Sequence, residues 1–469
     1  MAMRFLACCV GLSAFLVFIP SIAAAGTLTV GPGKMHAAPC AAIAAAAPGD
    51  VIEIDAAGTY QGDVCSWSTD GLTLRGVNGR PKIDAAGKNA AGKGVYVVAA
   101  DHVTFENLEI YGAKVPDNNG AGIRHQGKDL VVRGVYFHDN ENGILGSPAK
   151  DGEGSVLIEQ SEFAQNGFGD GYSHNLYLGA YGSVTMQSSY SHGAKVGHLL
   201  KSRARINRIL YNRLTDEAGS TASYELDFPN GGLTYVIGNL IEQSAETENP
   251  TVLAYGEEGT SNADQHLFFV HNTVVNDRAN GGTIVNIANG VTEPALVANN
   301  VLLGQATVST QASSKLQGNC VDTVANAKLV DAASFDYHLG AGSPCIDHGV
   351  DLANPDLLPT QQYEHPTHTV ARAAVGPIDP GAYEFGNAPP DAGGGTSPPD
   401  GGGSTGGSPE AGPPDGQTDS ATASSGDSDS GCGCRTVPNA GSRTRLGGML
   451  LLAAVATLAS VRARARRKL

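Results

Sequence analysis

A short motif that recurs about every 27 residues constrains this chain more than any other feature. Its clearest copies lie at 174–244, where each has a short apolar run, a turn rich in Gly, Ser or Arg, a second apolar run, and a small polar residue before a third. This step falls at Asn107, Gly134, Ser161, Ser188, Asn212, Asn239, Asn272 and Asn300, so it is polar in every copy except that of Gly134. Self-similarity at such a period indicates a solenoid, a propeller or an array.

The length of the motif favours a solenoid. A propeller blade has four strands and about 40 residues or more, which is longer than these copies. The apolar runs are short and rich in Val, Ile, Leu and Ala, and only 6% of the residues are aromatic. Such runs are typical of short strands that stack on copies of themselves. We therefore predict an all-β solenoid, in which each polar residue hydrogen-bonds to its copy in the next coil and forms a ladder.

The N-terminus has the pattern of an export signal. Arg4 precedes an apolar run, and three alanines ending at Ala25 come before Gly26. This layout predicts a signal peptide over 1–25 with cleavage after Ala25. Residues 26–93 are expected to form an N-terminal cap and the first coils, since terminal repeats need a polar outer face.

The C-terminal part changes composition three times. Residues 305–385 are expected to form the last coils and a cap, after the main repeats of 94–304. Residues 386–431 are nearly all Gly, Pro, Ser, Asp, Thr and Ala, which predicts a disordered linker. The tail 432–469 contains Cys432, Cys434, an apolar stretch at 446–461 and a basic end. The apolar stretch predicts a hydrophobic membrane helix with a cytoplasmic basic stop behind it.

Four cysteines lie between the signal and the tail. Cys40 and Cys65 are 25 residues apart, and so are Cys320 and Cys345. That separation is about one coil, so stacking would bring each pair close to bridging distance. We predict one disulfide in the first coil and one in the last, in keeping with export. Four free thiols are the alternative.

The net charge excludes one class of partner. The chain carries −16 at neutral pH, and the basic tail conceals an even more acidic middle. Such a body repels phosphate backbones, so nucleic acid is not an expected partner. We expect a monomer.

With these residues in view, two resemblances can be stated. The coils at 94–304 resemble the right-handed parallel β-helix of the pectate-lyase-like superfamily, and the ending SPCIDHG…DPGAYEF is similar to the close of many exported β-helix proteins. The tail resembles myxosortase-type sorting signals. That second resemblance implies cleavage near Cys432 or Cys434 by a sorting protease, and a protein left on a cell-surface anchor.

The coil register predicts one outward column of side chains. Leu176 and Leu200 stand at matching inward positions, so alternation turns Tyr177 and Lys201 outward. In the next coil the same argument turns Glu225 and Asp227 outward. The expected exposed column is Tyr177, Lys201 and Asp227, with Arg203, Arg205 and Glu225 beside it, and with Arg124 or His125 two coils away.

This column suits chemistry on uronic acids. β-Elimination needs a base for the proton at C5 and a positive charge or metal for the substrate carboxylate. We expect Lys201 to act as the base, with Arg203 and Tyr177, and expect Arg203 and Arg205 to lower its pKa. Glu225 and Asp227 could bind Ca²⁺, and no other cofactor is indicated.

A further resemblance concerns the stretch LLKSRA, Leu199–Ala204. It resembles the Lys-bearing coil of β-helix lyases such as chondroitinase B and its alginate-lyase relatives, which implies a Lys base assisted by an Arg about one coil later. Here that later coil reads SYELDF, with acids and no Arg. The predicted substrate is an extracellular acidic polysaccharide.

Other interpretations remain open. Lys201 and the arginines opposite Glu225 and Asp227 could form a structural charge ladder, with each exposed pair contributing about 0–1 kcal/mol. The chain would then be a non-catalytic rod that binds glycans or other cells. Glu225 and Asp227 could serve glycoside hydrolysis, although neighbouring acids on one strand do not face each other across a cleft. His174 and His198 are expected to be structural, and no third ligand nearby suggests zinc.

Overall fold

The computed structural model describes residues 25–247 and 249–387. Most of the predicted signal peptide lies outside these residues. So do the linker, Cys432, Cys434 and the apolar stretch 446–461. In the described part of the chain, no helix is both long and apolar enough to cross a membrane.

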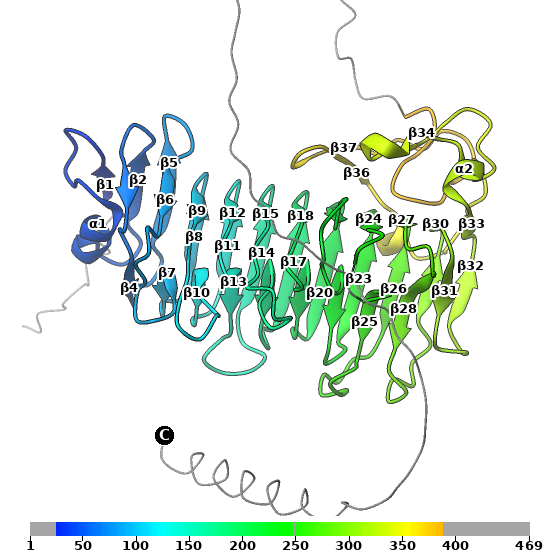
Figure 1. Ribbon diagram of the computed structural model, residues 1–469, viewed down its shortest axis with the longest axis horizontal. Helices are drawn as coiled ribbons and strands as arrows, with labels where there is room; N and C mark the ends of the chain where they lie inside the picture. The colour runs from blue at the N-terminus through cyan, green and yellow to red at the C-terminus, as the bar shows by residue number, and fades with distance from the viewer. Residues whose placement is uncertain (1–24, 248, 388–469) are drawn as a thin grey trace, which may run out of the picture. The chain divides into compact units, whose positions relative to one another are not determined.

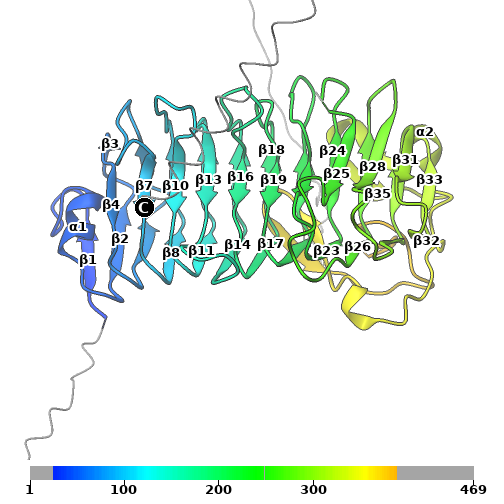
Figure 2. The same cartoon turned by 90° about the horizontal axis from the view of Figure 1, so that it is seen from below.

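Three parallel sheets run along the length of the molecule and make it a parallel β-solenoid (Figures 1 and 2). The chain visits the sheets in turn, and each strand pairs with its counterparts one coil before and one coil after. Parallel pairing of this kind satisfies the backbone of every inner coil from both sides. The predicted all-β solenoid is confirmed.

The first sheet has twelve strands. They are β1 (Thr27–Val30), β2 (Val51–Asp55), β5 (Thr73–Val77), β8 (Val103–Glu106), β11 (Leu130–Arg133), β14 (Ser155–Glu159), β17 (Ser183–Gln187), β20 (Ile206–Leu210), β23 (Leu233–Ile237), β26 (Leu267–Val270), β29 (Leu296–Ala298) and β32 (Lys315–Gln317). Alternate side chains along each strand of this sheet point toward the core. Leu130 and Val132 of β11 are buried, while Arg133 is exposed.

The second sheet has eleven strands. They are β3 (Tyr60–Gln61), β6 (Lys82–Asp84), β9 (Glu109–Tyr111), β12 (Tyr136–His138), β15 (Glu162–Ala164), β18 (Tyr190–His192), β21 (Arg213–Thr215), β24 (Leu240–Gln243), β27 (Thr273–Asn276), β30 (Val301–Leu303) and β33 (Cys320–Asp322). Phe137 and Phe163 occupy equivalent inward positions in β12 and β15, and their rings stack with centroids 5.0 Å apart.

The third sheet has ten strands and carries the predicted column. They are β4 (Cys65–Trp67), β7 (Gly94–Val98), β10 (Ala121–His125), β13 (Asn142–Gly146), β16 (Leu176–Leu178), β19 (Leu200–Ser202), β22 (Leu226–Phe228), β25 (Thr251–Tyr255), β28 (Gly282–Ile287) and β31 (Ala306–Ser309). Leu200 and Leu226 are paired and fully buried, so the residue after each points away from the core.

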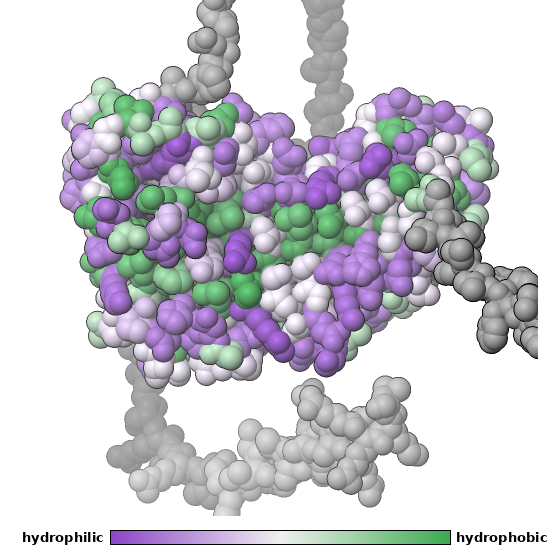
Figure 3. All heavy atoms as spheres, turned by 180° about the vertical axis from the view of Figure 1, so that it is seen from behind, coloured by the Kyte–Doolittle hydropathy of each residue, from purple (hydrophilic) through white to green (hydrophobic). Residues whose placement is uncertain are grey.

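Helix α1 (Pro39–Ala45) lies against the first strands, as Figure 1 shows. The far end carries α2 (Val324–Ala327), the 3₁₀ helices η1 (Ala332–Ser334) and η2 (Pro355–Leu357), and the antiparallel pairs β34 (Leu329–Asp331) with β35 (Asp336–Leu339) and β36 (Gln361–Glu364) with β37 (His368–Ala371). Seen from behind, the upper edge is hollowed between two raised ends (Figure 3).

Both predicted disulfides are present. Cys40 is bonded to Cys65 and Cys320 to Cys345, with Cα atoms 5.8 and 5.4 Å apart. The two bridges therefore lie at opposite ends of the coil stack.

The asparagine ladder is real, but three of the repeated positions, Asn107, Gly134 and Ser188, lie outside it. Asn239 shows the pattern: its Oδ1 accepts from the backbone N–H of Asn212, and its own N–H donates to Oδ1 of Asn272. The ladder residues are Ser161, Ser189, Asn212, Asn239, Asn272, Asn300 and Asn319. The predicted step at Ser188 is wrong, because Ser189 fills it.

Asn107, Gly134 and Ser188 instead occupy the position just before the ladder. All three have positive φ angles, between 51° and 60°. Gly and Asn tolerate this left-handed conformation best, so this position attracts the same residue types as the ladder beside it. The sequence repeat merged two adjacent structural positions into one.

Candidate functional site

The outward column on the third sheet has the predicted register. Tyr177 of β16 pairs with Lys201 of β19, and Lys201 pairs with Asp227 of β22. Arg124 belongs to the same column two strands earlier, through Leu145. The column is less exposed than expected, since Lys201 and Asp227 are only 8% and 3% exposed. They lie in a cavity and not on an open surface.

The cavity has a volume of about 470 Å³. Its residues come from the column, from the two coils around it and from loops before β16 and after β25. They are Gly171, Tyr172, His174, Tyr177, His198, Lys201, Arg203, Tyr224, Asp227, Ala254, Glu257 and Glu258. A partly enclosed space of this size with several ionisable groups is the usual form of a small-molecule or sugar site.

Lys201 is held by two carboxylates. Its Nζ donates to Oδ2 of Asp227 at 2.6 Å and to Oε1 of Glu258 at 2.9 Å. Asp227 is nearly buried, whereas the side chain of Glu258 is 50% exposed. The ammonium group therefore has a fixed inner partner and an outer partner open to solvent.

These partners reverse the expected pKa shift. Burial alone would lower the pKa of Lys201, but Asp227 and Glu258 outweigh it and the pKa is raised. The prediction that neighbouring arginines lower this pKa is wrong, because the two carboxylates are closer partners. Burial also raises the pKa of Asp227, against the lowering effect of Lys201. The free protein thus holds Lys201 as an ammonium ion at neutral pH.

Arg203 is the second cation of the cavity, as predicted. Its Nε donates to the hydroxyl of Tyr177 at 2.9 Å, and its Nη1 donates to Oδ1 of Asn230 at 2.6 Å. Its Nη2 donates to Oε2 of Glu258, also at 2.6 Å. Both Lys201 and Arg203 lie within 6 Å of the ring centroid of Tyr177. Tyr177 therefore contacts both cations.

The two histidines form a buried stack beside the column. The rings of His174 and His198 are 4.4 Å apart, and Nδ1 of His174 accepts the backbone N–H of His198. Burial lowers the pKa of His174 to about 3 and the pKa of His198 well below its usual value. Nε2 of His198 lies 3.4 Å from Oδ2 of Asp227. The stack thus supplies neutral rings to the wall of the cavity.

Glu225 does not lie beside the column, which corrects the prediction. It sits in a bend just before β22, where strand alternation does not yet apply, and it is fully buried. Its Oε2 accepts from Nε2 of Gln243 on the second sheet. Burial raises its pKa well above the usual value. The expected pairing with Asp227, for Ca²⁺ or for glycoside hydrolysis, is therefore not formed.

The donor set also argues against a calcium site at Asp227. Its Oδ2 already accepts from the ammonium of Lys201, and its expected partner points into the core. Nowhere in 25–247 and 249–387 do three His, Cys, Asp or Glu side chains gather in a way that could hold a metal ion. The residues present do not fit Ca²⁺ at this position.

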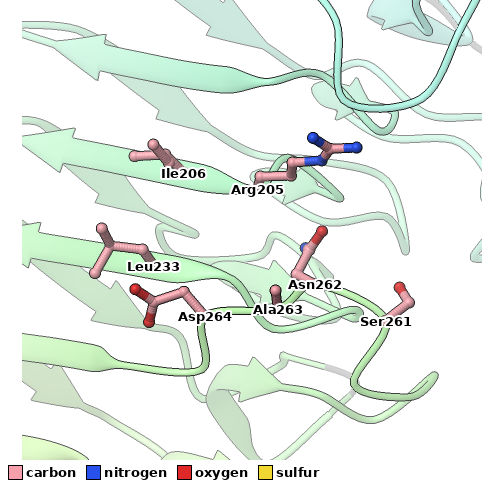
Figure 4. A pocket seen from close by; sticks show the side chains of 7 residues that line it. All are labelled: Arg205, Ile206, Leu233, Ser261, Asn262, Ala263 and Asp264. Atoms are coloured by element: carbon pink, nitrogen blue, oxygen red, sulfur yellow. The ribbon is translucent and has the colours of Figure 1, made fainter.

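Two further predicted residues lie elsewhere. His125 ends β10 on the inward side, is fully buried, and bonds to the hydroxyl of Tyr181 through Nδ1 at 2.7 Å. Arg205 lines a separate cavity of about 500 Å³ (Figure 4). Arg205 lies in the turn between β19 and β20, two residues after Arg203, and so it is not beside the column. Its Nη2 donates to the backbone oxygen of Asp151.

The sequence argument missed several residues of the cavity. Glu258 belongs to the loop that follows β25, and Tyr224 and Asn230 flank β22. None of them belongs to the repeating pattern, so strand register could not have identified them. A weak signal was present for the loop, because the coil from Asn239 to Asn272 is the longest of the series.

Comparisons with known proteins agree with the architecture. The structure described as "Crystal structure of pectate lyase Pel9A" is similar, with a TM-score of 0.51 and 14% sequence identity over 78% of this chain and 97% of that chain. No protein-family model matches the sequence, and no curated protein is similar to it. At such low identity the similarity shows the fold alone. The chain is accordingly a parallel β-solenoid with a pectate-lyase-like β-helix fold.

Proposed function

We propose that this protein is an exported, carbohydrate-active β-helix that binds an acidic polysaccharide in the Lys201 cavity and cleaves it by β-elimination. The observation that carries this proposal is the pairing of two cations, Lys201 and Arg203, around Tyr177 in one outward cavity. Asp227 and Glu258 pair with these cations in the free protein, and an anionic sugar can pair with the same two cations where it replaces the half-exposed Glu258.

The surrounding surface supports a long substrate. Arg124 stands in the same column two coils from Tyr177, so a third positive charge lies along the axis of the rod. The similar fold carried by a protein described as a pectate lyase adds support from analogy.

In the proposed reaction Lys201, as the free amine, removes the proton at C5 of a uronate. The electron pair of that C–H bond forms the C4–C5 double bond, and the C4–oxygen bond of the glycosidic link breaks. The leaving oxygen takes a proton, which the hydroxyl of Tyr177 can supply. Arg203 neutralises the uronate carboxylate and so stabilises the negative charge that develops next to it.

The experiment is a direct assay over a panel of uronate polysaccharides. Ultraviolet absorbance of the new double bond should rise with at least one of them, most rapidly at alkaline pH. Neutral polysaccharides serve as the matched control. An absence of unsaturated product with every uronate at every pH would contradict the proposal.

A second function is favoured by one observation. The ammonium of Lys201 is closed in by two ion pairs, and such an arrangement can hold a binding surface together without chemistry. The protein would then bind acidic glycan as a non-catalytic rod. It would retain the polysaccharide on an affinity gel, and the assay described above would give no product.

Surface display is part of the proposal and has its own support. The motif ending at Ala25 and the tail around Cys432 and Cys434 both carry the sequence pattern of exported, processed proteins. Mass spectrometry of the mature protein should find an N-terminus at Gly26 and a C-terminus near one of the two cysteines. A full-length chain in the cell interior would contradict it.

A further inference from the structure

One carboxylate of the protein itself bridges the two cations of the cavity. Oε1 of Glu258 accepts from Nζ of Lys201 at 2.9 Å, and Oε2 accepts from Nη2 of Arg203 at 2.6 Å. Each oxygen thus has its own cation. A uronate carboxylate has the same two oxygens and the same charge, so it would make the same contacts.

We infer that Lys201 and Arg203 form a binding site for a single carboxylate, which Glu258 fills in the free protein and which the carboxylate of an acidic sugar takes over by displacing Glu258. This inference deepens the proposed function, since it assigns the subsite that selects acidic sugars over neutral ones. Binding uses Lys201 as the ammonium ion, whereas the proposed reaction needs its free amine, so the inference does not require that the bound sugar be cleaved.

The two cations keep their places when Glu258 leaves. Lys201 remains paired with Asp227 at 2.6 Å, which lies beneath it in the next coil. Arg203 keeps Tyr177 and Asn230, bonded through Nε and Nη1. Only Nη2 of Arg203 and one N–H group of the Lys201 ammonium lose their hydrogen-bond acceptor. The vacated site is therefore preformed for another carboxylate.

Glu258 is the partner that can leave at low cost. Its side chain is 50% exposed, whereas that of Asp227 is 4% exposed. A half-exposed carboxylate regains water when it turns outward, but a buried one would lose its cationic partner without regaining water. Burial raises the pKa of Glu258, but its bonds to Arg203 and Lys201 outweigh that effect and lower the pKa, so it competes as an anion.

The loop that carries Glu258 is fastened on both sides of it. The backbone N–H of Glu258 donates to the oxygen of Pro229 at 2.9 Å. Further along, Nδ2 of Asn262 donates to the backbone oxygens of Ala204 and Gly231 at 3.1 Å. The exchange therefore needs a side-chain rotation at Glu258 and no opening of the loop.

The test measures carboxylate binding and needs no catalysis. Side-chain NMR signals of Arg203 and Lys201 are followed while galacturonate, or galactose as its neutral analogue, is added to the full chain. Glu258→Ala should bind galacturonate at least about tenfold more tightly than the unmodified protein, since it removes the competing charged hydrogen bonds. Galactose should bind equally weakly to both.

Two variants serve as controls. Glu293→Ala removes a half-exposed carboxylate outside the cavity, 3.7 Å from the ring of His266, and it should leave galacturonate affinity unchanged. Glu258→Gln keeps the size of the side chain and removes its charge, so it should show an intermediate gain if Glu258→Ala is poorly folded.

The inference is overturned if both Glu258 variants bind galacturonate no more tightly than the unmodified protein, or if Glu293→Ala gives the same gain. Its failure can be told apart from failure of the proposed reaction. A variant that gains galacturonate binding while no polysaccharide is cleaved supports the carboxylate site and contradicts the lyase.

Discussion

Two rows of polar side chains run through this molecule, and they obey opposite rules. In the asparagine ladder, the residues from Asn212 to Asn319 each bond to another asparagine in the next coil, as Asn212 does with Asn239. In the column of the third sheet, each residue meets a different kind: Tyr177, then Lys201, then Asp227. The first row is repetitive and buried, and the second borders a cavity.

The difference teaches where a solenoid can place chemistry. A buried amide must satisfy its hydrogen bonds, and an identical neighbour does so in every coil. A row of unlike, charged residues has no such internal pairing rule, so it draws partners from loops, as Lys201 draws Glu258. In this molecule the repeated ladder residues contribute to stability, and residues that depart from the repeat form the candidate site.

The largest effect on activity is expected from replacing one residue of the column. We expect Lys201→Ala to lower the cleavage rate by roughly 10²–10⁴-fold, the usual contribution of a general base. Lys195→Ala is the matched control, because Lys195 is exposed and pairs with Asp139 outside the cavity. Initial rates of double-bond formation give the measurement, and equal rates in both variants would remove Lys201 from the mechanism.

A change in the ladder should lower the stability of the fold and leave the cleavage rate of the folded protein unchanged. Asn239→Ala leaves the backbone N–H of Asn212 and the oxygen of Ile209 without their buried partner. We expect a loss of about 3 kcal/mol in the free energy of unfolding, with the cleavage rate of the folded protein unchanged. Urea unfolding followed by circular dichroism measures it. A loss below about 0.5 kcal/mol would mean that the ladder is incidental.

The pH dependence of the cleavage rate tests whether Lys201 acts as the base. Because the pKa of Lys201 is raised above the ordinary 10.5, the free amine is scarce at neutral pH, and the rate should rise about tenfold per pH unit in the alkaline range below that pKa. The same group stabilises the fold fully below the ordinary pKa, and this contribution is lost as pH rises through the raised one. A rate that stays constant through the neutral and alkaline range would instead favour the neutral ring of His198 as the base, because its pKa lies well below the usual value.

The smallest effect tests the corrected ladder position. Ser189→Ala removes the hydroxyl that accepts from the backbone of Ser161, and should cost about 1 kcal/mol. Ser188→Ala changes a neighbour outside the ladder and should cost less than about 0.5 kcal/mol. Thermal unfolding of the two variants side by side gives the result. The reverse order would restore the position predicted from the repeat.

Features that depend on the coil period alone were predictable. Both disulfides follow from a separation of about one coil, and the meeting of Lys201 with Asp227 follows from strand register. These features need only the knowledge that equal windings stack. The extension of the column to Arg124 follows from the same rule.

Features set by turns and loops were not predictable. Glu225 was expected to alternate with Asp227, but the bend before β22 turns it into the core. Ser188 was confused with Ser189, because the left-handed turn and the ladder favour similar residues. The pKa of Lys201 moved in the opposite direction because Glu258 comes from a loop, and the lowering expected from Arg205 is absent where that side chain enters another cavity.

The coil between Asn239 and Asn272 has a consequence for how such proteins change over time. Its additional length lies largely in the loop 256–266, whereas the preceding coil crosses the same corner with residues 229–232. The strands on either side keep their pairing, since β23 and β26 remain in step. An insertion at one corner can therefore bring a new acid to an old cation without disturbing the winding. A loop at one corner can thus differ in length and charge from its neighbours while the coils keep their register.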